Sequence, residues 1–213
     1  WNNWRGFIQL HAAAGIKFGF GDTGTIFQKN IVSKNAAIGI WKDVGLAGTV
    51  IDANMVEENT GYGILSEISH ADSANPTRIS NNIIRDNHLY GYGVVVSGGT
   101  YNHIYHNTLL GNNITLVEGD WALGTTHPNG QPLAYNRVFN NIIRDPGKNA
   151  PGTSWGYSIG RPVDGGIMPG TGAVAVHDNL IDNNLYHNTA ANIPYATAPM
   201  FRLLQIGGSG SAL

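Results

Sequence analysis

The segment that decides the fold runs from Gly39 to Ser69 and reads GIWKDVGLAGTVIDANMVEENTGYGILSEIS. The pentamer Gly39-Ile-Trp-Lys-Asp43 returns 24 residues later as Gly63-Ile-Leu-Ser-Glu67, with the glycine, the isoleucine and an acid at matching places. Between the pentamers, two asparagines five residues apart flank an apolar pair. The segment therefore contains one complete turn of a repeat, and repeats are identified before local secondary structure is assigned.

The asparagine pair recurs in six turns along the chain. The first asparagines are Asn30, Asn54, Asn82, Asn107, Asn141 and Asn179, at steps of 24, 28, 25, 34 and 38 residues. The second asparagines are Asn35, Asn59, Asn87, Asn112 and Asn184, and Pro146 takes this place in the fifth turn. Apolar residues come in short β-branched runs, and no stretch of about ten residues keeps a helical period. These features predict an all-β parallel β-helix of about seven turns, each made of three short strands.

Two columns beside the first asparagine are apolar in all six turns and are predicted to form the core. Three residues before it lie Phe27, Ile51, Ile79, Ile104, Val138 and Val176, and two residues after it lie Val32, Val56, Ile84, Leu109, Ile143 and Ile181. The asparagines are predicted to form an internal amide ladder at the spacing of paired strands, about 4.8 Å. In the third strand of each turn, alternation places Ile40 and Ile64 inside and Trp41, Asp43 and Glu67 outside.

Composition restricts the function classes. Charged residues make up 12% of the 213-residue chain, against about 25% in typical domains. A net charge of −2 without a local cluster of lysine and arginine argues against nucleic acid as a partner. Cysteine is absent, which excludes thiolate metal sites, a cysteine nucleophile and disulfides. No apolar run approaches the roughly 18 residues of a membrane span.

The length predicts one domain. We expect the β-helix over residues 1–206, with an incomplete first turn at 1–24 and a C-terminal cap at 193–206. Residues 207–213 have the composition of a flexible tail or linker. The chain opens without methionine and inside a repeat, so we expect that it lacks an N-terminal part. Long loops rich in glycine and proline are predicted at 119–134 and 147–172.

Asp43 and Glu67 are the first candidates for chemistry. On neighbouring turns, their Cα atoms should lie about 5 Å apart. Such a pair suits acid and nucleophile work on a glycosidic bond, but it equally suits a Ca²⁺ site or a purely structural role. Trp41 should project beside Asp43, either as a sugar platform or as a tryptophan packed under a loop. Lys17 falls in the Trp41 column one turn earlier, where it could act as a base or bind a uronate.

A second candidate set lies on another face. Arg78, His103 and Arg137 each precede the first asparagine by four residues in three consecutive turns, and Tyr105 accompanies His103. Cations that neutralise a carboxylate, together with a base for the C5 proton, are what β-elimination of a uronic acid requires. The alternative is that these residues form a solvated surface over the strands. The histidines show no HxH or HExxH pair, so a zinc site is not indicated.

The repeated turns resemble the right-handed parallel β-helix superfamily, which includes pectate lyases, polygalacturonases, alginate lyases and tailspikes. More narrowly, Gly15-Ile-Lys-Phe18, Gly39-Ile-Trp-Lys-Asp43, Thr49-Val-Ile-Asp-Ala-Asn54 and Gly63-Ile-Leu-Ser-Glu-Ile-Ser69 are similar to uncharacterised secreted bacterial β-helix proteins. Their turns read roughly Gly-Thr-Lys-Phe, Gly-Leu-Trp-x-Asp and Gly-Ile-x-x-Glu-Ile-Ser. The resemblance covers residues 10–145. It implies a right-handed helix and a secreted or cell-surface bacterial protein.

The resemblance leaves Asp43 and Glu67 as the positions that transfer from that group. Where those proteins carry a further acid, this chain has Ala12-Ala13-Ala14, so a three-carboxylate site is not supported. Three functions stay open, each with a polysaccharide or oligosaccharide partner. The first is a glycoside hydrolase using Asp43 and Glu67 without a cofactor. The second is a polysaccharide lyase that acts on a uronate-containing glycan, either without a cofactor or with Ca²⁺ bound at Asp43 and Glu67. The third is a non-catalytic glycan-binding or structural solenoid.

Overall fold

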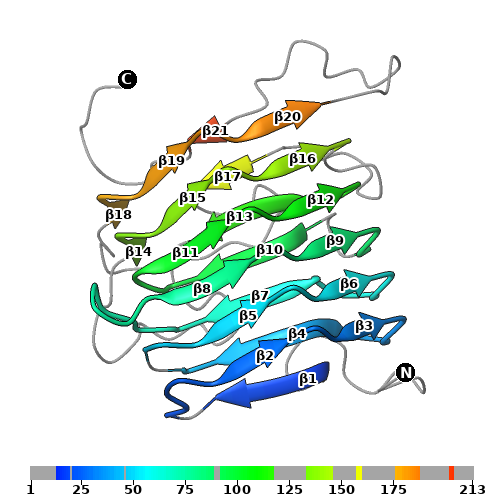
Figure 1. Cartoon of the computed structure of the whole chain (residues 1–213), viewed down its shortest axis with the longest axis horizontal. Coiled ribbons are helices and arrows are strands. Elements are labelled where there is room, and N and C mark those ends of the chain that lie inside the picture. The colour runs from blue at the N-terminus through cyan, green and yellow to red at the C-terminus, as the bar shows by residue number, and fades with distance from the viewer. Residues whose placement is uncertain are drawn as a thin grey trace, which may run out of the picture.

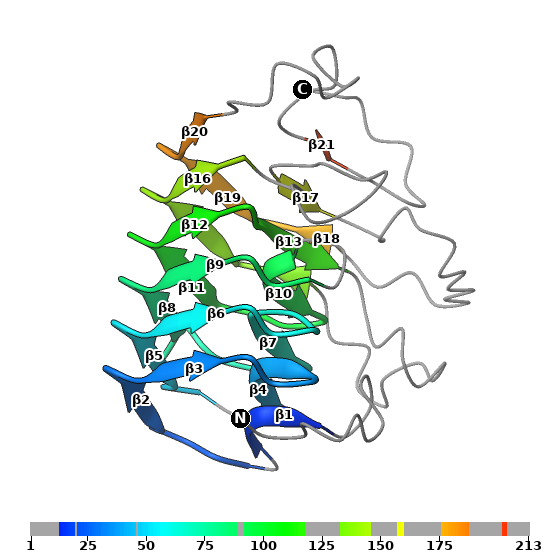
Figure 2. The same cartoon turned by 90° about the vertical axis from the view of Figure 1, so that its right-hand side faces the viewer.

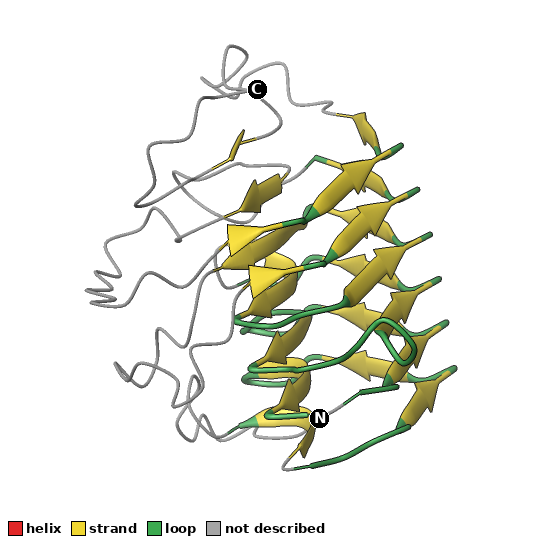
Figure 3. Cartoon of the chain, turned by 90° about the vertical axis from the view of Figure 1, so that its left-hand side faces the viewer, coloured by secondary structure: helices red, strands yellow, loops and turns green. Residues whose placement is uncertain are grey.

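The computed structural model describes residues 13–19, 21–45, 47–88, 92–117, 133–145, 157–159, 176–187 and 202–203. These residues form β-strands joined by short bends and contain no helix, and therefore none that could cross a membrane (Figure 3). Apart from the short pieces just given, the predicted loops 119–134 and 147–172, the cap and the tail lie outside the described residues.

The strands form three large parallel sheets. Within each sheet, the strands of successive turns lie one above another, from the N-terminal to the C-terminal end of the chain (Figure 1, Figure 2). Sheet A contains β1 (Ala14–Gly19), β4 (Ile38–Asp43), β7 (Ile64–Glu67), β10 (Tyr92–Ser97), β13 (Asn113–Val117), β17 (Tyr157–Ile159) and β21 (Arg202–Leu203). Sheet B contains β2 (Ile26–Gln28), β5 (Val50–Asp52), β8 (Thr77–Ser80), β11 (Asn102–Tyr105), β15 (Arg137–Phe139) and β19 (Leu180–Asp182). Sheet C contains β3 (Ile31–Ser33), β6 (Met55–Glu57), β9 (Ile83–Arg85), β12 (Thr108–Leu110), β16 (Ile142–Arg144) and β20 (Leu185–His187). The strands β14 (Leu133–Ala134) and β18 (Val176–His177) pair to form a small fourth sheet. The predicted parallel β-helix is confirmed.

The bends on either side of sheet C follow one rule. The residue before each ladder asparagine has a left-handed backbone, as at Ala53 (φ 54°) before Asn54 and Glu58 (φ 52°) before Asn59. This conformation costs a residue other than glycine about 1–2 kcal/mol. The hydrogen bonds of the asparagine that follows stabilise the bend against that cost.

The predicted asparagine ladders are confirmed. Asn82 is representative: its backbone N and its Nδ2 both donate to Oδ1 of Asn107 at 2.9 Å, and Nδ2 also donates to the carbonyl of Ile51 at 3.0 Å. Its own Oδ1 accepts from the backbone N and the Nδ2 of Asn54 at 2.9 and 3.0 Å. One ladder joins Asn30, Asn54, Asn82, Asn107 and Asn141, and the other joins Asn35, Asn59, Asn87 and Asn112.

The predicted register of the sixth turn is wrong by five residues. Asn141 donates to Asn184 at 2.9 Å, so Asn184 and not Asn179 continues the first ladder. The strand partner of Val138 is accordingly Ile181, not the predicted Val176. Bends recur every five residues within a turn, so a shift of one bend leaves the asparagine pattern almost unchanged.

Asn179 belongs to a third ladder that was not predicted. Asn102 donates through Nδ2 to Oδ1 of Asn136 at 2.9 Å, and Asn136 donates in the same way to Asn179 at 2.9 Å. In the turn below, the register partner of Asn102 is Thr77, which cannot continue an amide ladder. Among the described residues, the third ladder is therefore confined to the C-terminal turns, at the bend that leads into sheet B.

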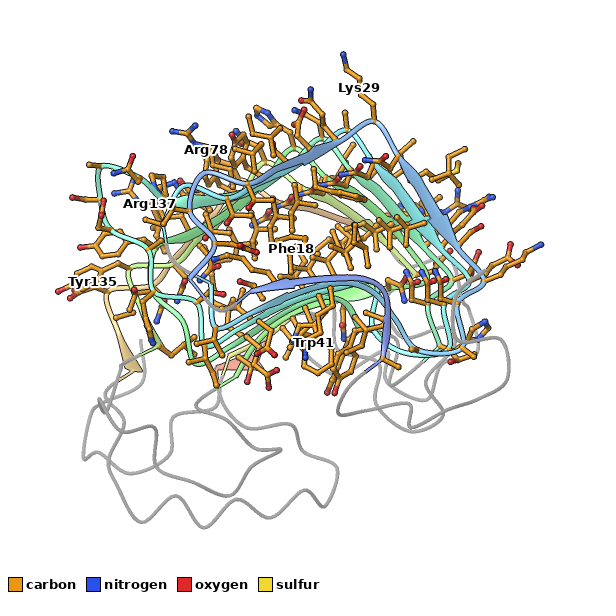
Figure 4. All side chains as sticks on the ribbon, turned by 90° about the horizontal axis from the view of Figure 1, so that it is seen from below. Phe18, Lys29, Trp41, Arg78, Tyr135 and Arg137 are labelled. Atoms are coloured by element: carbon orange, nitrogen blue, oxygen red, sulfur yellow. The ribbon has the colours of Figure 1, made fainter. Side chains whose placement is uncertain are left out.

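The core lies between the three sheets, where Figure 4 shows Phe18 near its N-terminal end. Its fully buried members include Ile40 and Ile64, as alternation predicts, and the middle members of the columns that flank the first ladder, while Phe27 and Ile181 at the ends are partly buried. The outer side of sheet A carries a second buried cluster, which consists of Ile38, Trp41, Tyr62, Leu65, Tyr92 and Val95.

Candidate functional site

Asp43 and Glu67 lie side by side on the outer face of sheet A. They are register partners at the ends of β4 and β7, as the 24-residue step predicts. Both are buried, with 8% and 7% of their surface exposed. Their adjacency is confirmed, but their burial differs from the open groove that a hydrolase pair needs around its substrate.

Each acid already has a partner within the sheet. The ammonium of Lys17 on β1 lies 2.7 Å from Oδ2 of Asp43. The indole N–H of Trp41 donates to Oε2 of Glu67 at 3.1 Å. Lys17 also lies 3.4 Å from the centroid of the Trp41 ring, a cation–π contact that joins the two pairs. The four side chains form one connected network, in which Lys17 binds Asp43 directly and is joined to Glu67 through Trp41.

Of the two roles expected for Trp41, the structure has the packed one. Trp41 is only 4% exposed, so it offers no platform to a sugar ring. It belongs to the outer apolar cluster, together with Leu65 on the next strand, and Figure 4 shows Trp41 on this outer side. Because this face carries an apolar cluster of its own, the indole packs among hydrophobic side chains and uses its N–H to bind Glu67.

Backbone strain follows directly after each acid. Val44 (φ 47°) and Ile68 (φ 46°) both have left-handed backbones, which β-branched residues rarely adopt. Gly98 takes the same conformation one turn later. The Val44 N–H donates to the carbonyl of Glu67 at 3.0 Å, which holds the bend in place. The bends at these two residues turn the chain sharply toward sheet B and fix where the two carboxyl groups lie.

The second candidate set forms a column on the outer face of sheet B. His103 on β11 is the register partner of Arg78 on β8 and of Arg137 on β15. Figure 4 shows Arg78 and Arg137 projecting from the same outer side. Both arginines are exposed and His103 is half-buried. The sequence prediction that these three residues align is confirmed.

The two arginines of this column have no carboxylate partner among the residues that the structure describes. Four other cations there do: Lys17 with Asp43, Lys34 with Glu58, Arg85 with Glu57, and Arg144 with Asp145. On sheet B, Asp52 accepts hydrogen bonds from Ser80 and Asn81 instead. Arg78 and Arg137 therefore present uncompensated positive charge to solvent.

Burial, then the charge of Arg137, then that of Arg78 lower the pKa of His103 below its ordinary value. At neutral pH its imidazole is therefore the uncharged form, which can accept a proton. Tyr105 lies two residues further on the same face, and its ring stacks on Phe139 at a centroid distance of 5.1 Å. Tyr101 and Tyr135, which the sequence reasoning missed, stack at 4.8 Å at the other end of these strands. Two aromatic pairs thus flank the basic column.

Comparison with known proteins agrees with this architecture. Residues 2–109, just over half of the chain, match the model of a family described as the right-handed β-helix region. The chain belongs to the right-handed β-helix family. Searches of curated proteins and of solved structures found no match. β-Helix domains of this family occur in pectate lyases and glycoside hydrolases, and also in proteins that are not enzymes.

The β-helix also holds a lysine in its interior that the sequence reasoning missed. Lys42 alternates with Trp41 and Asp43 on β4 and points inward, where it is 0% exposed. Its ammonium donates to Oγ1 of Thr77 at 2.8 Å. Burial lowers its pKa to about 7. The alternation of the sequence contained this signal, because Lys42 is two residues after the core residue Ile40.

Metal ligands do not gather in the described part of the β-helix. No group of three or more His, Asp and Glu side chains lies close enough there to hold an ion. Ca²⁺ at Asp43 and Glu67 stays a prediction. A hollow of about 250 Å³ lies at the N-terminal end of the β-helix and is lined by Gly15, Ile16, Phe27, Asn30, Ile31, Val32, Ser33 and Asn35. None of the predicted site residues lines it.

Proposed function

We propose that this β-helix protein binds an acidic polysaccharide along the outer face of sheet B. The observation that carries the proposal is the column of Arg78, His103 and Arg137, in which two exposed arginines lack a carboxylate partner among the described residues. A guanidinium binds a carboxylate or sulfate through two parallel hydrogen bonds, so such a column is chemically suited to an anionic chain.

The spacing of the column supports a polymer rather than a single ion. Register partners on parallel strands lie about 4.8 Å apart, so the Cα atoms of Arg78 and Arg137 are separated by roughly two such steps. Charges repeated along the helix axis match an anion that repeats along a chain. The flanking pairs Tyr101–Tyr135 and Tyr105–Phe139 add ring edges and hydroxyl groups on both sides.

The acid pair Asp43 and Glu67 gives weaker support to glycoside hydrolysis. Hydrolysis needs one carboxyl group to donate a proton to the glycosidic oxygen and the other to face the sugar. Asp43 is bound to Lys17 and Glu67 to Trp41, and both acids are buried. The hydrolase hypothesis stays a prediction, and Asp43→Asn tests it on any glycan that the protein is found to cleave.

Binding to polygalacturonate, compared with a neutral glucan, tests the proposal. We expect the wild-type protein to bind the uronate polymer, with an affinity that falls as salt rises. The double variant Arg78→Gln/Arg137→Gln should bind about 10–30-fold more weakly, because each exposed ion pair contributes on the order of 1 kcal/mol.

The matched control is Arg85→Gln/Arg144→Gln, which removes two arginines from sheet C that already have carboxylate partners. It changes the net charge by the same amount but leaves the column intact. Equal loss of binding in both double variants would show that net charge, and not the column, attracts the polymer. Binding of the neutral glucan as tightly as polygalacturonate would overturn the proposal.

Cleavage by β-elimination is a second candidate, favoured by the uncharged His103 between two arginines. The arginines would neutralise the uronate carboxylate, and the imidazole would remove the C5 proton. The electron pair then forms the C4–C5 double bond as the C4–O bond breaks, and a proton from Tyr105 would reach the leaving oxygen. Ultraviolet absorbance of the unsaturated product tests it: His103→Gln should abolish the signal, and a wild-type protein that binds without producing it is a binding protein only.

A further inference from the structure

His103 occupies the centre of a column of cations. Arg78 lies on the strand below it and Arg137 on the strand above, each as its register partner. On its own strand, Tyr105 is the next residue on the same face, and Tyr101 and His106 lie at the two ends. The acids of the sheet lie in the neighbouring column: Asp52, bonded to Ser80 and Asn81, and Asp182 beside Asn183.

This arrangement leaves His103 without a described negative charge to stabilise its protonated form. Burial and the two neighbouring guanidinium groups all lower its pKa. The imidazole is therefore the one member of the column whose charge can change between about pH 5 and pH 8, since arginine stays protonated throughout.

We infer that His103 makes anion binding on sheet B proton-linked, so that a bound polyanion draws a proton onto the imidazole and affinity rises as pH falls. This inference rests on the proposed function of the same face. A carboxylate or sulfate placed over Arg78 and Arg137 cancels the repulsion that keeps His103 neutral in the free protein. The column then holds three positive charges against the polymer.

The linkage is reciprocal. If the polymer stabilises the protonated imidazole, protonation must strengthen polymer binding by the same factor. Each unit by which the bound polymer raises the pKa of His103 corresponds to about a tenfold gain in affinity at low pH. The gain should begin as pH falls through the pKa that His103 has in the complex, and it should be complete below the pKa that His103 has in the free protein.

The experiment measures binding of the full chain to polygalacturonate and to dextran sulfate at a series of pH values between about 5 and 8. Dextran sulfate keeps its charge over this range, so any pH dependence seen with it belongs to the protein. We expect about tenfold tighter binding of both polymers at the acidic end. Titration of the His103 imidazole by NMR should show its pKa rising when dextran sulfate is added.

Two variants assign the effect. His103→Gln should bind with an affinity that no longer depends on pH, while His106→Gln, at the exposed end of the same strand, should keep the wild-type dependence. If the protein binds neither polymer at any pH, the proposed function is wrong and this inference falls with it. If binding occurs but does not depend on pH, or keeps its dependence in His103→Gln, the inference alone is overturned.

Discussion

The outer faces of sheets A and B carry charge in opposite ways. On sheet A, Asp43 and Glu67 are buried and each has a partner, Lys17 or Trp41. On sheet B, Arg78 and Arg137 are exposed without a carboxylate partner in the described part of the chain. Both faces are built by the same register of parallel strands. A column of like residues is therefore not enough to identify a binding site. A site is indicated only where the charges of those residues are not already paired within the protein.

The interior of the β-helix extends this comparison. Lys42 is also a cation without a described carboxylate partner, but it is fully buried and bonded only to Thr77 among the described contacts. An exposed unpaired cation remains hydrated, whereas a buried one loses most of its hydration. Replacing each kind of cation should therefore change stability by very different amounts.

The largest effect is expected from Lys42→Met. Burial lowers the pKa of Lys42 from 10.5 to about 7, so between those values the unfolded chain binds more protons than the folded one. The stability of the wild-type protein should therefore rise with pH between about pH 7 and pH 10.5. Below about pH 7, the full free-energy cost of burying the charged amine is present. At pH 7 the variant should be roughly 3–4 kcal/mol more stable, after the loss of one hydrogen bond worth about 1 kcal/mol.

Chemical denaturation at a series of pH values measures this effect. Lys29→Met is the matched control, because Lys29 is exposed at a bend and also lacks a described carboxylate partner. Its replacement should leave both the stability and its pH dependence unchanged. If Lys42→Met were no more stable than the wild type at pH 7, the buried amine would not be the costly cation that the comparison requires.

The next largest effect is expected from Asn82→Leu, which tests the ladder that supports both faces. The substitution removes the acceptor of the Asn54 N–H and Nδ2 groups and the donor to Asn107 and Ile51. With these buried groups left unsatisfied, the free energy of unfolding should fall by roughly 2–4 kcal/mol. The exposed Asn75→Leu provides the control, and a thermal shift of similar size in both variants would contradict a special role for the ladder.

Much of this fold could be predicted because its constraints are local and repeated. The steps between asparagines fix the strand register, so the pairing of Asp43 with Glu67 at a step of 24 and of Arg78 with His103 at a step of 25 followed from counting. The same regularity produced the error in the sixth turn. Asn179 and Asn184 both follow left-handed residues, Asp178 and Asn183, and the sequence alone does not tell which bend each one makes.

Exposure at the candidate site could not be predicted in this way. Alternation places Trp41 on the outer face of sheet A, but it does not show that the face is covered. The burial of Trp41 depends on an apolar cluster that includes Ile38, Tyr62 and Tyr92, which come from three different turns. Lys42 was missed for the opposite reason, because a lysine at an inward position conflicts with the usual cost of burying charge.

A smaller effect is expected from Trp41→Phe, which separates packing on sheet A from the bond to Glu67. Phenylalanine keeps most of the apolar contact but removes the N–H that donates to the buried carboxylate. The protein should lose roughly 1–2 kcal/mol of stability. A double-mutant cycle with Glu67→Gln should show coupling between the two positions, whereas additive losses would mean that the hydrogen bond contributes nothing.

The smallest effect on stability is expected from Arg78→Gln and Arg137→Gln, and it is the one that sharpens the comparison most. Each change should alter the free energy of unfolding by less than about 0.5 kcal/mol, because neither arginine has a described ion pair to lose. Arg85→Gln, which breaks the ion pair with Glu57, should lower the stability more than either of these changes. Denaturant midpoints of the three variants measure this order.

A neutral result for Arg78 and Arg137 gains its meaning from the binding experiment on the same variants. An exposed residue that contributes nothing to stability but is required for polyanion binding acts on a ligand. If either arginine proved as stabilising as Arg85, it would have a structural partner, and sheet B would resemble sheet A. The two faces would then be equivalent, and the basic column would lose the feature that distinguishes it from the acid pair.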